Sequence, residues 1–143
     1  MLPGIKIGFA NGAIGSVAPN ADGVIGLAIT GVAVVDKFAL ATPYQLFKID
    51  DLKALGITDQ VADANSFIYK TVKEFYDEAG EGAELWLMAF PDTTFPSAIV
   101  DLTKENAKSL LLTANGRIRS LVVAFKPAIG YTSTLEEGLD SDV

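Results

Sequence analysis

The chain has 143 residues and a formal net charge of −7, and it contains neither cysteine nor histidine. This composition excludes disulfides, thiol chemistry, an imidazole base and a zinc site with nitrogen or sulfur ligands within the chain. The acidic balance argues against a nucleic-acid surface and against binding to an anionic membrane. The length predicts one domain. Half of the residues are hydrophobic, so we expect a core large enough to be stable without disulfides or a structural metal.

The N-terminal segment, residues 1–19, is rich in glycine, carries little charge and lacks the apolar core of a signal peptide. Apolar residues alternate with a charged or small residue over Ile5, Lys6, Ile7, Gly8 and Phe9. This alternation predicts a short strand. The strand can pair with the edge of its own sheet or with the edge of a neighbouring subunit's sheet. We treat these five residues as a candidate assembly arm. A strand inside the chain's own fold and a frayed terminus are the alternatives.

A turn signal over residues 20–23 precedes a charge-free run over residues 24–35. β-Branched residues dominate this run and predict a buried central strand that bends near Gly31. A buried helix is the competing interpretation, but Gly26 and Gly31 disfavour it. We therefore expect this run at the centre of the sheet.

A short strand over residues 46–49 and a short helix over residues 50–56 are predicted next. Asp50 is the expected cap of this helix, because a short polar side chain accepts from an unpaired backbone N–H. Asp51 favours the positive end of the helix dipole, and Gly56 is expected to stop the helix.

The longest helix is predicted over Ala64–Ala79, where apolar residues recur at helical spacing. Its apolar stripe consists of Phe67, Ile68, Val72, Phe75, Tyr76 and Ala79. Its opposite face is charged and consists of Lys70, Lys73, Glu74, Asp77 and Glu78. Asp63 or Asn65 is expected to cap the start, and Gly80 and Gly82 to end the helix. The charge-free run after this hinge, residues 85–90, predicts a strand buried on both faces.

The last predicted elements are a loop over residues 91–96, a helix over residues 103–115 and a largely buried strand over residues 117–125. The apolar stripe of this second helix consists of Ala107, Leu110, Leu111 and Ala114. Asn115 and Gly116 close the helix, and Pro127 ends the strand. We expect residues 128–143 to be an acidic tail or the start of a truncated element such as a helix, in an N-terminal fragment of a longer protein.

Strands and helices alternate in this order, which predicts an α/β layered fold. Its central sheet is expected to be mostly parallel or mixed and to be flanked by two main amphipathic helices. We assign this domain to residues 20–127.

Candidate chemical groups are few. The glycines over residues 8–15 do not form a dinucleotide motif, and no phosphate-cradling loop motif occurs. Adjacent carboxylates occur at Asp50 and Asp51, at Asp77 and Glu78, and at Glu136 and Glu137. Adjacent residues on a helix point in different directions, so we expect these pairs to be caps or solvated faces. A hard-cation site from Glu136, Glu137, Asp140 and Asp142 lacks the spacing of a calcium loop.

The remaining candidates have no supporting partners. No serine has a histidine or a G-x-S-x-G context; those weighed are Ser66, Ser97, Ser109, Ser120 and Ser133. Lys126 is the one candidate for a Schiff-base lysine, and Trp86 is expected in the core rather than against a ligand. We therefore expect no enzymatic activity, no cofactor and no metal.

Four segments together resemble the N-terminal half of contractile tail sheath proteins. They read GVIGLAITG at residues 23–31, YQLFKIDDLKALGI at 44–57, VKEFY at 72–76 and ELWLM at 84–88. Sheath chains show a similar order of strand, short capped helix, longer helix ending in glycines, and hydrophobic strand. The resemblance covers residues 23–90, and the helix and strand over residues 104–125 are compatible with it.

This sequence departs from the sheath pattern in two respects. An arginine is often found at the end of the last of these strands, and Ala89 and Phe90 stand there instead. The characteristic C-terminal sheath region is also missing, as expected of an N-terminal fragment.

The resemblance implies a structural, homo-oligomeric subunit of a phage or prophage tail, or of a related contractile injection device. Sheath subunits form stacked rings in a helical assembly around a tail tube, and contraction releases energy stored in that lattice. The implied partners are neighbouring sheath subunits, tail tube and baseplate proteins, without nucleic acid or a membrane anchor. The implied location is the virion tail, and the cytoplasm of a bacterial host during assembly. Sheath termini reach into neighbours, and residues 5–9 are the segment that matches this role.

Two other functions stay open. One is a small-ligand or nucleotide-binding α/β domain, with a site at the strand ends near residues 91–94 or Lys126. The other is an acidic enzyme that acts through Asp or Glu and a metal.

Overall fold

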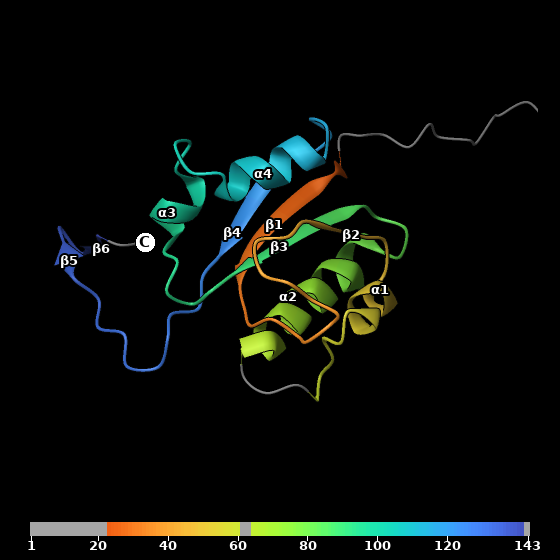
Figure 1. Cartoon of the computed structure of the whole chain (residues 1–143), viewed down its shortest axis with the longest axis horizontal. Coiled ribbons are helices and arrows are strands. Elements are labelled where there is room, and N and C mark those ends of the chain that lie inside the picture. The colour runs from red at the N-terminus through yellow and green to blue at the C-terminus, as the bar shows by residue number, and fades with distance from the viewer. Residues whose placement is uncertain (1–22, 61–63, 142–143) are drawn as a thin grey trace, which may run out of the picture.

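The computed structural model describes residues 23–60 and 64–141 of the chain (Figure 1). Its helices and strands alternate along the chain, as the sequence predicts for an α/β fold. In chain order they are β1 (Ile25–Thr30), β2 (Tyr44–Leu46), α1 (Ile49–Ala54), α2 (Ala64–Ala79), β3 (Leu85–Phe90), α3 (Pro96–Val100), α4 (Asn106–Thr113), β4 (Ser120–Ala124), β5 (Leu135–Glu136) and β6 (Leu139–Asp140). The predicted assembly arm at residues 5–9, the capping candidate Asp63 and Asp142 of the candidate hard-cation site lie outside the described residues.

Four strands form a mixed, mostly parallel sheet in the order β2-β3-β1-β4. β1 runs parallel to both β3 and β4, and β2 runs antiparallel to β3. The two charge-free runs of the sequence therefore become the two inner strands, β1 and β3. The α/β fold class predicted from the sequence is confirmed.

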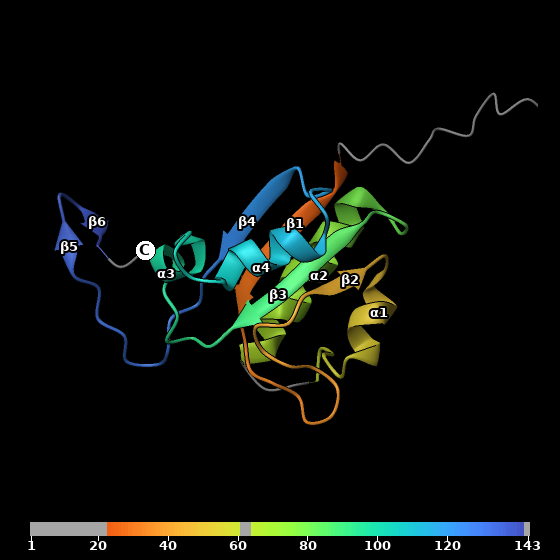
Figure 2. The same ribbon diagram turned by 45° about the horizontal axis from the view of Figure 1, so that its top comes forward.

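Helices cover both faces of this sheet (Figures 1 and 2). α1 and α2 lie on one face, and α3 and α4 lie on the other. α2 and α4, of 16 and 8 residues, are the two main helices, as predicted. The chain thus forms three layers with an apolar core on each side of the sheet.

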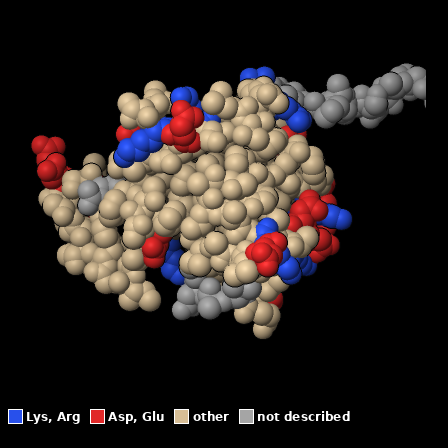
Figure 3. Space-filling model, in the orientation of Figure 1, with Lys and Arg blue, Asp and Glu red and all other residues tan. Residues whose placement is uncertain are grey.

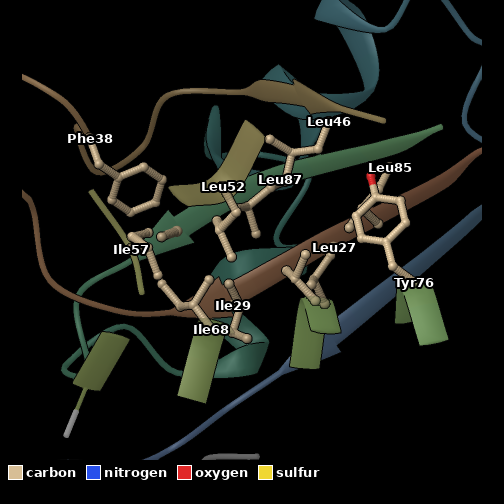
Figure 4. Close-up of a cluster of buried hydrophobic side chains, with 12 residues drawn as sticks. Leu27, Ile29, Phe38, Leu46, Leu52, Ile57, Ile68, Tyr76, Leu85 and Leu87 are labelled. Atoms are coloured by element: carbon tan, nitrogen blue, oxygen red, sulfur yellow. The ribbon is translucent and has the colours of Figure 1, made fainter. Parts of the chain in front are cut away.

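The larger core lies between the sheet and the α1–α2 layer (Figure 4). β1 contributes Leu27 and Ile29, and α2 contributes Ile68, Val72 and Tyr76. The core also contains Phe38, Leu46, Leu52, Ile57, Leu85, Leu87 and Ala89. Phe67 and Phe75 pack at its margin, so the predicted stripe of α2 is confirmed except for Ala79, which is exposed.

The predicted bend at Gly31 is where β1 ends. A side chain at Gly31 would place its Cβ 2.4 Å from Ile68 Cδ1, so any larger residue here requires the Ile68 side chain of α2 to shift. Asn65 does not cap α2, because it lies inside the helix and binds the chain after β1. Its Oδ1 accepts from Val32 N at 2.9 Å and its Nδ2 donates to Val32 O at 2.9 Å.

α1 begins one residue earlier than predicted, and its cap differs. Its first helical residue is Ile49, so the predicted strand over residues 46–49 moves back to β2. Asp51, not Asp50, satisfies the backbone at this end, since its Oδ2 accepts from Phe47 N at 2.8 Å and Lys48 N at 3.2 Å. The predicted stop at Gly56 is confirmed by its φ of +80°.

The region between β3 and β4 contains one helix that the sequence analysis missed. α3 starts at Pro96, which was assigned to a loop, although proline is favoured in the first turn of a helix. α4 is shorter than predicted, and it buries Ala107 and Leu110 but leaves Leu111 36% exposed.

The sequence analysis was wrong about the burial of the last strand of the sheet and about a helix after it. β4 is only partly buried. Residues 135–140 form a small antiparallel hairpin, β5–β6, where a tail or a helix start was expected. Glu137 and Gly138 at its turn have φ of 52° and 87°, which is the conformation of a tight two-residue hairpin turn.

Candidate functional site

The most distinctive surface of the molecule is the open edge of the sheet at β4. Among the described residues, β4 pairs with β1 along one side and with nothing along the other. Such an edge presents unpaired backbone N–H and C=O groups and is a template for another strand. The other edge strand, β2, is three residues long and offers much less backbone.

One face of β4 is also only partly covered, because Ala124 packs against the larger core and Val122 does not. Leu121 and Val123 pack in the smaller core with α4, whereas Val122 points to the opposite face and is 46% exposed. On that face α2 lies against β1, and β4 stands at the margin of the layer (Figure 1). An apolar side chain thus stands beside an unpaired strand edge, and this combination favours a protein contact.

The open edge is basic although the chain is acidic. Both arginines of the chain, Arg117 and Arg119, immediately precede β4, and Lys126 follows it. No acidic residue occurs between residues 116 and 126. Arg119 is exposed and makes no ion pair within the described part of the chain.

Arg117 has a different role, because it pairs with Glu84. The Glu84 side chain is 10% exposed. Its Oε1 accepts from Gln45 Nε2 at 2.9 Å and from Trp86 Nε1 at 2.8 Å. One carboxylate therefore joins β2, β3 and the turn before β4. The sequence analysis did not identify Glu84, and its position directly before a charge-free strand was the only available signal.

A small cleft lies at the carboxyl ends of the three parallel strands. Its volume is about 180 Å³, and it is lined by Thr30, Gly31, Asp92, Lys126, Pro127, Ala128 and Ile129. The connections from β1 and β3 leave to opposite faces of the sheet here, which is where α/β proteins often bind ligands. The hydroxyl of Thr30 is already bonded to the backbone: its Oγ1 accepts from Lys126 N at 2.9 Å and donates to Lys126 O at 3.3 Å. The sequence analysis placed a candidate ligand site near residues 91–94 or near Lys126. Asp92 and Lys126 line the same cleft.

The adjacent carboxylates lie on the surface, as predicted. Asp50 accepts from Lys53 Nζ at 2.8 Å, and this hydrogen bond and the lysine charge lower the pKa of Asp50. Asp77 pairs with Lys73 one turn away. Glu136 and Glu137 are exposed on the hairpin.

The other candidates are dispersed. Ser66 lies in α2, Ser97 in α3, Ser109 in α4 and Ser120 at the start of β4. Trp86 packs beside the smaller core, where the sequence analysis expected it. The described residues contain no group of three or more acidic side chains arranged to hold a metal ion. Of the helices in the described ranges, none has the length and apolarity to cross a membrane.

The family model described as DUF2586, N-terminal domain, matches residues 2–130. No curated protein and no solved structure matches the chain.

Proposed function

We propose that this chain, which belongs to the family described as DUF2586, N-terminal domain, is a structural subunit that assembles with copies of itself as a contractile tail sheath does. The observation that carries the proposal is the open edge of β4, with the exposed Val122 beside it. A surface of this kind favours strand addition or apolar contact with another protein. Contacts between two different surfaces of identical subunits build rings and open helices.

The distribution of charge on the described surface is compatible with this role. On the face shown in Figure 3, charged side chains lie mainly around the rim and leave a broad uncharged centre. Exposed apolar side chains also occur away from β4, including Leu102 before α4 and Leu112 within α4. These residues offer contact area without the desolvation of charged groups.

Three further statements of the proposal come from the resemblance to sheath proteins. The partners are neighbouring subunits, tail tube and baseplate proteins. The place of action is the virion tail, after assembly in the bacterial cytoplasm. The subunit stores and transmits energy in a lattice and performs no catalysis.

Assembly state tests the proposal directly. The full-length protein is expected to form large ordered polymers or tubes, which electron microscopy and sedimentation velocity detect. A small closed oligomer that never polymerises over a range of concentration and salt would refute the sheath assignment.

The predicted assembly arm gives a second test. Deletion of residues 1–9 is expected to block polymerisation while the remaining domain keeps its cooperative unfolding transition. The reason is that an arm used between subunits contributes contacts only in the polymer. If the deletion abolishes folding instead, the strand over residues 5–9 belongs to the chain's own core.

The cleft at the strand ends supports a second candidate function, a small-ligand or nucleotide-binding domain. The observation in its favour is that Asp92 and Lys126 line one cleft at the switch point of the sheet. A ligand that binds only the folded state raises the melting temperature. A rise with magnesium or a nucleotide favours this candidate, and the variant Asp92→Ala is expected to abolish that rise.

A further inference from the structure

The β5–β6 hairpin stands away from the sheet, beyond α3, in both views of the molecule (Figures 1 and 2). Three aromatic rings hold its base there. The ring of Phe95 lies 5.6 Å from that of Phe125 and 5.5 Å from that of Tyr131. Tyr131 also donates its hydroxyl to Asp140 of β6, with 2.8 Å to Oδ2. Within one chain, these contacts fix the hairpin on the α3 side.

The two strands of the hairpin contribute little stability of their own beyond the contacts at its base. Each strand is two residues long, and an isolated two-stranded hairpin is marginally stable in water. Leu135 and Leu139 are 66% and 75% exposed. Because Leu135 pairs with Asp140 and Leu139 with Glu136, the two leucines lie on opposite faces. A partner that lies along the hairpin would bury apolar surface that one chain leaves in water.

The charge of the hairpin is opposite to that of the β4 edge. Glu136 and Glu137 are exposed at its turn, and Asp140 follows. The β4 edge has Arg119 before it and Lys126 after it, and its Val122 offers apolar area to a leucine. Among the described strands, β4 is the longer of the two edges of the main sheet.

We propose that the β5–β6 hairpin of one copy docks along the β4 edge of a second copy, with its glutamates beside Arg119. This inference rests on the proposed self-assembly and names the two surfaces that meet. The two surfaces differ, so each copy carries one of each and the contact continues from copy to copy. Complementary charges steer and orient such a contact, and salt weakens it.

A charge swap in the full-length protein tests the docking. Arg119→Glu alone, and Glu136→Lys with Glu137→Lys, are each expected to weaken association about tenfold, as measured by the critical concentration for assembly. All three changes together are expected to restore most of the lost association, because the opposite charges meet again. Lys70→Glu and Glu78→Lys, on the exposed face of α2, are the matched controls and are expected to leave assembly unchanged.

A second variant tests the apolar part of the contact. Leu135→Ser with Leu139→Ser is expected to weaken association while the unfolding transition of the domain stays in place, since both side chains are exposed. The docking is wrong if the swapped variant assembles no better than its parents, or if the charge variants assemble like the wild type. Loss of assembly on deleting residues 1–9, without any effect of the charge variants, would assign the β4 edge to the arm instead. Those outcomes leave self-assembly standing, whereas a wild-type protein that never assembles refutes the proposed function itself.

Discussion

Tyr76 of α2 places a hydroxyl group inside the larger core. The residue is 6% exposed, and its hydroxyl oxygen is buried without a hydrogen-bond partner (Figure 4). The ring of Tyr76 packs against that of Phe75, with the two centroids 5.0 Å apart. This contact stabilises the ring but gives the hydroxyl group no hydrogen bond. A buried polar group without a partner loses its hydration and receives nothing in return.

The variant Tyr76→Phe is therefore expected to raise the free energy of unfolding by about 1 kcal/mol. Tyr44→Phe is the matched control, because the Tyr44 hydroxyl accepts from Ala39 N at 2.8 Å and its removal leaves that N–H unpaired. Urea denaturation measures both, and the two changes should have opposite signs. A destabilised Tyr76→Phe variant would mean that the hydroxyl is bonded in solution.

Tyr76 also predicts a loss of stability in alkali. Burial, and secondarily the charge of Asp51, raise the pKa of Tyr76 above its ordinary value of 10.0. The free energy of unfolding is not lowered by this ionisation below pH 10.0. It falls as the pH rises further, because the unfolded chain then releases a proton that the folded chain keeps. The slope approaches about 1.4 kcal/mol per pH unit for this one group. Tyr76→Phe should show a shallower decline above that pH than the wild type.

At the scale of elements, Glu84 joins parts of the sheet that are far apart in sequence. Its side chain accepts from Gln45 of β2 and Trp86 of β3 and pairs with Arg117 before β4. Glu84→Gln keeps the shape but removes the charge that Arg117 faces, so we expect a loss of about 1–2 kcal/mol in unfolding free energy.

A double-mutant cycle with Arg117→Gln measures how much of that loss belongs to the pair. The combined variant should lose less than the sum of the two single losses. Additive losses would show that Glu84 acts through Gln45 and Trp86 alone. Asp101→Asn is a comparison at a carboxylate that bonds only near neighbours in sequence, such as Thr103.

The inner elements of this fold were predictable because their sequence signals are strong and local. Residues 24–30 and 85–90 lack charge, and inner strands of a parallel sheet are buried on both faces. The stripe of α2 has a clear helical period, and Gly56, Gly80 and Gly82 adopt positive φ where helices were predicted to stop.

The features of the candidate site were less predictable because they depend on tertiary placement. The apolar run before Phe125 favours a buried strand, but apolarity does not say whether a helix covers a strand, and β4 is only partly buried. α1 begins at Ile49, so its N-cap is Lys48, and Asp51 in the first turn reaches back to the backbone there in place of the expected cap Asp50. The hairpin did carry a local signal, Glu137 followed by Gly138, which was read as part of an acidic tail.

For the molecule as a whole, the helix layers cover the sheet unequally. α1 and α2 lie over β2, β3 and β1 (Figure 2). On that side of β4, Ala124 packs against their core while Val122 stays 46% exposed. If this edge had no partner, we would expect a longer helix layer to cover it or polar residues to line it. Val122 is the residue best suited to test whether this edge contacts another subunit, because it is exposed on the face opposite α3 and α4.

Val122→Glu is expected to leave the unfolding free energy within about 0.5–1 kcal/mol of the wild type, since the side chain is half in water at a sheet edge. It is expected to weaken self-association of the full-length protein, because assembly would then have to bury a charge without a partner. Val100→Glu in α3 is the matched control: Val100 is 50% exposed, close to the 46% of Val122, and it lies in the opposite layer. Sedimentation velocity on both variants separates a specific edge contact from general loss of apolar surface. Equal effects of the two substitutions on assembly would contradict a role for the β4 edge.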